Sequence, residues 1–164
     1  MDPVQRVQAP IGQRALLLTA TLPPAGDWIR GISIRQPWAT SIASGAKTVE
    51  NRPKPWSWRG WLLLHAGLQT DRAALRLPLV ARTIRGRDLP TGAVIGVARL
   101  TGCHQDPNGS PPCTPWSEPG RWHLELAGVQ ELPLPIPARG QLGPWKPTED
   151  LVAQVRQQLP DLRP

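Results

Sequence analysis

The alternation of apolar and polar positions along the chain predicts short strands separated by a few helices. Residues 32–34 alternate as a short strand does, and residues 38–46 carry apolar side chains at the four-residue spacing of one helix face. Residues 48–52 return to an extended pattern that ends at Pro53. Residues 61–65 are apolar at every position, so we expect a strand that is covered on both faces.

The same reading continues through the middle of the chain. Thr70 and Asp71 cap a predicted helix, which Pro78 should kink or divide. Residues 93–100 are small and β-branched, which predicts a buried strand. Residues 121–126 alternate between apolar and polar side chains, so we expect a strand with one face buried and one exposed.

The end of the chain predicts an edge strand followed by a last helix. Residues 129–136 contain Pro133 and Pro135, which cannot donate to a neighbouring strand, so this segment should lie at a sheet edge. Thr148 is placed to cap the last helix. The side chains of that helix that should face inward are Leu151, Val152, Val155 and Leu159.

Together these elements predict one α+β domain, a small barrel of short strands decorated by helices. Residues 1–30 are interrupted by prolines and are expected to form a poorly specified N-terminal leader, in which only residues 15–22 could pair as a strand. The domain should span residues 31–147. Residues 148–164 should form a C-terminal helix packed on the domain.

Composition narrows the class of protein. A hydrophobic content of 40% in 164 residues is enough for a packed core. No apolar run of about 18 residues is present, so no membrane contact is expected. Two cysteines are too few for a disulfide scaffold, and the first residues do not resemble a secretory signal. We therefore expect a cytoplasmic protein.

The net charge of +7 is concentrated in one part of the chain. Residues 30–99 hold twelve basic and three acidic residues, a net charge of +9, against −2 for all other residues. Most of the basic residues are arginines, which make bidentate contacts with phosphates and stack on bases. A nucleic-acid partner is one interpretation, and a solvated basic face that keeps the protein soluble is the other.

The densest group of charged residues is the segment Gly45–Arg52, which holds Lys47, Glu50 and Arg52. Side chains two positions apart on a strand share a face, so Glu50 and Arg52 should point the same way and Val49 should face the core. Such a cluster can bind phosphate or transfer protons, with Glu50 as base and Lys47 as electrostatic stabiliser. It can equally be a structural ion pair that joins strand and helix.

This segment resembles the GxKxxExR motif of the ASCH domain, a member of the PUA-like superfamily. Residues 33–39, Ser-Ile-Arg-Gln-Pro-Trp-Ala, are similar to the opening of one large branch of that family. Residues 59–66, Arg-Gly-Trp-Leu-Leu-Leu-His-Ala, resemble the strand that follows the motif. Further matches fall at residues 92–98, 122–124, 135–140 and 143–145, so the resemblance covers about residues 31–147.

The resemblance implies a PUA-like β-barrel of about five or six strands with roughly three helices. It implies a cleft formed by the helix after the first strand, the motif strand and neighbouring loops, and a role in binding RNA. One branch of the family hydrolyses N4-acetylcytidine, and another member is reported to be a ribonuclease. The hydrolase branch has a threonine where this chain has Glu50 and a later glutamate near the position of Arg99, so only Lys47 matches.

Several residues are candidates for the walls of this cleft. Gln36 can read a base edge, and Trp38 can either stack on a base or pack in the core. His65 can be an acid–base group, a metal ligand or a hydrogen-bonded structural residue, and Trp145 can close the pocket or pack in the core. The full set of binding candidates is Arg35, Gln36, Trp38, Lys47, Glu50, Arg52, Lys54, His65, Arg99 and Trp145.

Metal binding is not predicted. Cys103, His104 and Cys113 offer three ligands, and His123 could add a fourth, but structural zinc sites normally contain more closely spaced pairs. We therefore expect reduced cysteines, no metal and no cofactor.

The sequence leaves three hypotheses about function. The first is a binding module that holds RNA or a modified nucleoside in the cleft, with phosphates on the arginine-rich stretch. The second is a hydrolase in the same cleft, acting on an acylated nucleoside or on RNA, with Lys47 and Glu50 as catalytic residues. The third is a protein-interaction domain whose partner the sequence does not name.

Overall fold

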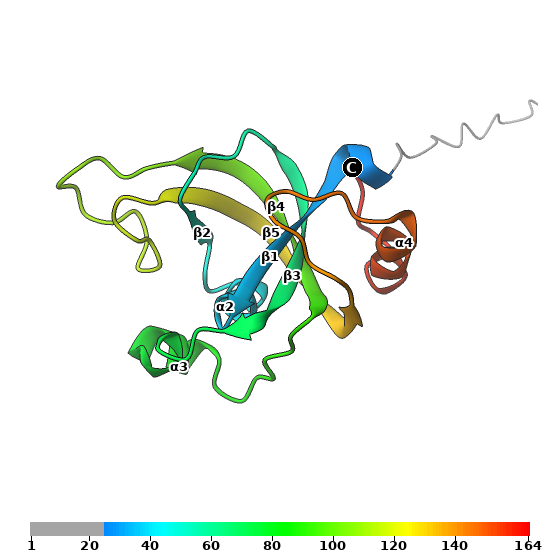
Figure 1. Cartoon of the computed structure of the whole chain (residues 1–164), viewed down its shortest axis with the longest axis horizontal. Coiled ribbons are helices and arrows are strands. Elements are labelled where there is room, and N and C mark those ends of the chain that lie inside the picture. Colours follow the sequence, from blue (N-terminus) through cyan, green and yellow to red (C-terminus); the bar gives the residue numbers. More distant parts are fainter. Residues whose placement is uncertain (1–24) are drawn as a thin grey trace, which may run out of the picture.

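The structure is a computed structural model that describes residues 25–164 (Figure 1). The possible strand at residues 15–22 lies outside the described residues. The strands are β1 (Ile29–Gln36), β2 (Val49–Arg52), β3 (Gly60–Thr70), β4 (Ala93–His104) and β5 (Trp122–Pro137). The helices are α1 (Ala25–Trp28), α2 (Trp38–Ala43), α3 (Pro78–Thr83) and α4 (Glu149–Gln158), with a 3-10 turn at Ala74–Arg76. The described residues contain no helix long and apolar enough to cross a membrane.

The strands form one mixed sheet in the order β1-β3-β4-β5-β2. Strands β1 and β3 are parallel, and the other neighbours are antiparallel. The two end strands, β1 and β2, do not pair with each other, so in the described part of the chain the sheet is open where we expected a closed barrel. Part of the edge of β1 is taken instead by Trp145, whose backbone pairs with Gly31.

Strand β3, which lies between β1 and β4, separates two hydrophobic clusters. Leu62 and Leu64 pack with Ile42 of α2 on one face. Leu63 packs with Val155 of α4 on the other face. The expectation that this strand is covered on both faces is therefore confirmed, because alternate side chains of a strand enter opposite layers. Helix α2 lies against β1, β3, β4 and β5 on the concave side of the sheet (Figure 1).

Several elements differ from their predicted extents, and the two strands predicted at residues 121–126 and 129–136 are one strand, β5. Strand β1 begins at Ile29, since Trp28 and Ile29 are already buried in the core beside α4. Helix α2 ends at Ala43, because Gly45 takes a φ of +85° and reverses the chain. The helix predicted after Thr70 and Asp71 is divided at Pro78, as expected, but its first part is only the 3-10 turn, and α3 starts at Pro78.

The end of the chain matches its prediction closely. Beyond the part of β5 that pairs with β2, residues 129–136 pair only with β4, as expected of an edge segment with two prolines. The side-chain amide of Gln158 covers this edge by hydrogen-bonding both the N–H and the C=O of Leu134. The Thr148 hydroxyl accepts from the Leu151 N–H and so caps α4 as predicted.

Candidate functional site

A cleft lies where the two end strands of the sheet face each other. It consists of two adjoining hollows that share Ser33, Gly67, Leu68 and Leu142. The motif hollow has a volume of about 580 Å³ and includes Arg35 from β1 with Glu50 and Arg52 from β2. The His65 hollow has a volume of about 760 Å³ and lies under the loop of residues 138–142. The larger hollow is therefore not the one that contains the motif.

Glu50 is the acidic centre of the motif hollow. The alternation of β2 turns Glu50 and Arg52 to one face, with Glu50 Oε1 at 3.5 Å from Arg52 Nε, while Val49 is buried on the other. The predicted sharing of a face is thus observed. The other end of the Arg52 guanidinium donates to the Ser33 C=O at 2.9 Å, so this side chain joins β2 to β1 across the open edge of the sheet.

Lys47 lies behind Glu50 and outside both hollows. Its side chain is 1% exposed, and its ammonium donates to Glu50 Oε2 at 2.9 Å and to the Val49 C=O. The ammonium also lies 5.7 Å from the centroid of the Trp38 ring, within the range of a cation–π interaction. Lys47 therefore positions the carboxylate of Glu50 from the protein side, which favours the structural ion pair over a lysine that touches a ligand.

Arginines surround the carboxylate on the solvent side. Arg35 is exposed on β1, and Arg121 is exposed just before β5; both line the motif hollow with Arg52. Arg121 was not among the sequence candidates, because only the pairing of β2 with β5, in which Arg52 faces Trp122, brings it beside the motif. Asn51 also lines this hollow, and its amide fixes the β4–β5 loop by donating to the Trp116 C=O and accepting from the Glu118 N–H.

Gln36 and Trp38 are held mainly by the protein itself. Gln36 is fully buried, and its amide donates to the Pro90 C=O at 2.8 Å and accepts from the Thr40 N–H at 3.1 Å. Both ends of that amide are occupied, so Gln36 is not retained as a reader of a base edge. Trp38 packs edge-on against Trp116 with ring centroids 6.5 Å apart, yet it also lines the motif hollow, so both interpretations of this residue hold in part.

Ser33 and His65 line the His65 hollow, and their Oγ and Nδ1 atoms are buried without a hydrogen-bond partner among the described residues. His65 Nε2 lies 2.8 Å from the Ala138 C=O, which only accepts, so Nε2 carries a proton. A Cβ on residue 140 would collide with both Ser33 Oγ and the His65 ring, so the loop passes them only because Gly140 has no side chain. Ser33 and Gly140 lie in segments that resemble the family, but no chemical feature of the sequence singled them out.

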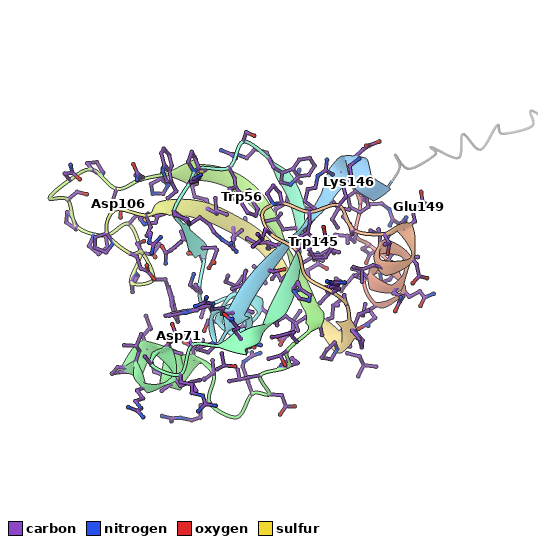
Figure 2. The ribbon with its side chains drawn as sticks, in the orientation of Figure 1. Trp56, Asp71, Asp106, Trp145, Lys146 and Glu149 are labelled. Carbon is purple, nitrogen blue, oxygen red and sulfur yellow. The ribbon has the colours of Figure 1, made fainter. Side chains whose placement is uncertain are left out.

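The remaining candidates lie away from the two hollows. Arg99 is exposed on β4, with its guanidinium 5.7 Å from the centroid of the Trp61 ring, and Lys54 is exposed beyond β2. Trp145 is buried against Gly31 and stands edge-on to His65 with centroids 6.1 Å apart (Figure 2). The structure thus supports the core interpretation of Trp145, which fixes His65 from behind.

The rim of the cleft is apolar. Leu68 is 82% exposed and Leu142 is 98% exposed, and both border the two hollows. The arrangement combines an apolar rim, a fixed carboxylate, three arginines and two unpaired polar atoms in one cleft.

Comparison with known proteins bears on most of this cleft. A search of curated protein sequences found no match. The family model of the ASCH domain matches residues 32–133, a range that contains the motif segment, β2, most of β1 and His65, and ends before the loop of residues 138–142. Because this match covers well over half of the chain, the protein belongs to the ASCH domain family.

Proposed function

We propose that the cleft binds RNA or a modified nucleoside. The ASCH domain is consistent with such a role, and the arginines of the motif hollow supply the contacts that phosphates require. We further propose that the curved sheet corresponds to a PUA-like barrel that stays open between β1 and β2, so that the opening itself is the binding cleft.

The observation that carries the proposal is the fixed carboxylate of Glu50 among three arginines. Lys47 and Arg52 hold Glu50 in place, and its side chain remains 11% exposed to the motif hollow. A carboxylate accepts hydrogen bonds from the exocyclic amino group or ring N–H of a base. Arg35 and Arg121 lie at the same hollow and suit the phosphate or sugar of the same nucleotide.

The His65 hollow extends this site. His65 Nδ1 and Ser33 Oγ lie under Gly140, so a ligand that displaces the loop of residues 138–142 would gain free energy by pairing with them. Leu68 and Leu142 between the hollows offer apolar contact to the face of a base. A base in one hollow and a substituent or neighbouring nucleotide in the other would use both sets of contacts.

The hydrolase alternative has less support from the geometry. Lys47 is covered by Glu50 and does not line either hollow, and Arg99 lies on a different surface. Glu50 alone remains as a candidate base for a reaction in the cleft. Binding without turnover is therefore the function that we propose, and the experiment below includes turnover as an outcome.

The proposal is tested by the salt dependence of binding to a fluorescein-labelled single-stranded RNA. We expect the R35A/R121A variant to bind more weakly and to show a slope of log affinity against log salt that is smaller by about two. The matched control is Arg99→Ala, an exposed arginine outside the cleft, which should leave the slope nearly unchanged. Equal losses in both variants, or no binding by the wild type to RNA or to any nucleoside of a panel, would contradict the proposal.

Turnover is measured in the same samples by liquid chromatography after incubation with N4-acetylcytidine and with RNA. We expect the substrates to be recovered unchanged. If the wild type forms product and Glu50→Gln does not, the hydrolase alternative replaces the binding proposal.

A further inference from the structure

The loop between β4 and β5 brings four potential metal ligands together at its base. His104 ends β4 and pairs in register with His123 near the start of β5. The loop folds back so that Asp106 and Cys113 meet these two imidazoles, and one ligand atom from each of the four residues lies within 4.8 Å of the others. Figure 2 shows Asp106 in this loop, at the end of the molecule opposite Glu149 of α4.

The separations between these atoms fit one tetrahedral ion. His104 Nε2 lies 3.3 Å from Asp106 Oδ1, and His123 Nδ1 lies 3.6 Å from the same oxygen. Cys113 Sγ lies 3.4 Å from His123 Nδ1. Zinc bonds to nitrogen, oxygen and sulfur, arranged tetrahedrally, place neighbouring ligand atoms about 3.3–3.6 Å apart. Three of the six separations therefore already match the spacing that the ion requires, and all six lie within 4.8 Å.

In each of the two histidines, one ring nitrogen is hydrogen-bonded to the protein and the other ring nitrogen faces the cluster. His104 Nδ1 lies 2.6 Å from the Glu125 carboxylate, and His123 Nε2 lies 3.0 Å from the Glu118 C=O. Both partners accept, so the ring protons belong on these nitrogens, and His104 Nε2 and His123 Nδ1 keep their lone pairs for a metal. Metal-binding histidines are oriented in this way by a carboxylate or a backbone carbonyl.

Hydrogen bonding and exposure also leave Asp106 and Cys113 available to a metal ion. The Cys113 N–H donates to Asp106 Oδ2 at 2.9 Å, which leaves Oδ1 directed to the histidines. Cys113 is exposed, so an ion can reach its thiol from solvent.

We propose that His104, Asp106, Cys113 and His123 bind one zinc ion that fixes the β4–β5 loop. Two imidazoles, a thiolate and a carboxylate form a donor set that suits zinc, and four protein ligands leave no open position, as in structural sites. This departs from the sequence expectation of no metal, which counted Cys103 and overlooked Asp106. Cys103 does not belong to the cluster.

The ion would act on the candidate cleft through the loop. Trp116 and Glu118 of this loop are hydrogen-bonded by Asn51, the neighbour of Glu50 on β2, and Arg121 at the end of the loop lines the motif hollow. Fixing the base of the loop thus fixes one wall of the cleft. The zinc site itself stands independently of the function proposed for that cleft.

The experiment measures zinc in the full chain by elemental mass spectrometry, after expression with added zinc and removal of loosely bound metal by a chelator. We expect one zinc per chain in the wild type and in Cys103→Ser, and its loss in Cys113→Ser. Cys103→Ser is the matched control, because it removes the other thiol of the chain and leaves the cluster intact. Zinc retained in Cys113→Ser, or lost equally in both variants, would overturn the proposal.

Cobalt(II) titration of the metal-free wild type provides a second readout that does not depend on the folding of a variant. We expect the visible bands of tetrahedral cobalt together with a thiolate-to-cobalt charge-transfer band, both displaced by one equivalent of zinc. His104→Gln should bind cobalt more weakly at unchanged circular dichroism. A wild type that gives neither band would overturn the proposal.

Discussion

The buried ammonium of Lys47 holds the Glu50 carboxylate, a potential contact for a ligand, in place. Its ammonium is enclosed by the Trp38 ring, the Val49 C=O and the Glu50 carboxylate. A buried ion pair of this kind is a weak source of net stability, but removing one partner leaves the other charge uncompensated. Lys47 therefore contributes to the site through the position of Glu50.

Replacing Lys47 by methionine tests this role. We expect Lys47→Met to lower the free energy of unfolding by about 3–5 kcal/mol, because Glu50 then keeps only the longer contact to Arg52. Urea denaturation followed by tryptophan fluorescence measures the change. The control Lys54→Met removes an exposed lysine beyond β2 and should change stability by less than about 0.5 kcal/mol. Equal effects of the two variants would contradict the assignment.

Gly140 provides the second test at this scale. We expect Gly140→Ala to displace the loop of residues 138–142, because the new methyl group would collide with Ser33 and His65. Overpacking of this kind costs about 1–3 kcal/mol and should also weaken ligand binding at the His65 hollow. The control is Gly67→Ala, whose Cβ would meet its nearest atom at an ordinary 3.7 Å. Thermal unfolding of both variants decides the point, and an unperturbed Gly140→Ala would refute it.

At the scale of elements, the sequence pattern predicted those structural features that depend on residues close together in the sequence. The two-sided burial of β3, the N-cap of α4 and the shared face of Glu50 and Arg52 all follow from side-chain periodicity or capping. The strand predicted at residues 61–65 was too short, since β3 continues to Thr70, which pairs with Gln36 of β1. Such pairing joins residues distant in sequence, so a local pattern does not contain it.

The dependence on pairing between distant segments also explains which residues of the site could be predicted from the sequence. Glu50 and Arg52 came from one motif, whereas Arg121 and Asn51 gained meaning only through the pairing of β2 with β5. His123 was assigned to a polar, outward face of its strand, yet it is fully buried. It is buried because the β4–β5 loop folds over it and supplies Cys113 and the Glu118 C=O as partners.

The edge of β5 yields a prediction about an element. Gln158 of α4 completes this edge through two hydrogen bonds to Leu134, so Gln158→Ala should lower stability by about 1–2 kcal/mol and leave an exposed strand edge. Gln157→Ala, on the same helix but exposed, is the control and should be nearly neutral. Denaturant unfolding and light scattering measure the two effects. Identical curves for the two variants would show that the edge is not covered in this way.

At the scale of the whole molecule, the basic residues of segment 30–99 do not all lie at the cleft. Arg35 and Arg52 reach the cleft, whereas Arg87 pairs with Glu131 at 3.0 Å and Arg99 lies over Trp61. The excess charge therefore does not form a single surface around the site. Arg121, outside that stretch of sequence, adds to the cleft instead.

In the whole molecule, we propose that the opening between β1 and β2 is the ligand site. This is tested most directly by a titration of the ¹⁵N-labelled protein with single-stranded RNA and with the nucleoside that binds best, followed by NMR. We predict that chemical shifts change most at residues 33–35, 50–52 and 139–142 and at Arg121, which line the two hollows. Shifts centred on Arg99 and Trp61, or no shifts with any ligand, would contradict the account.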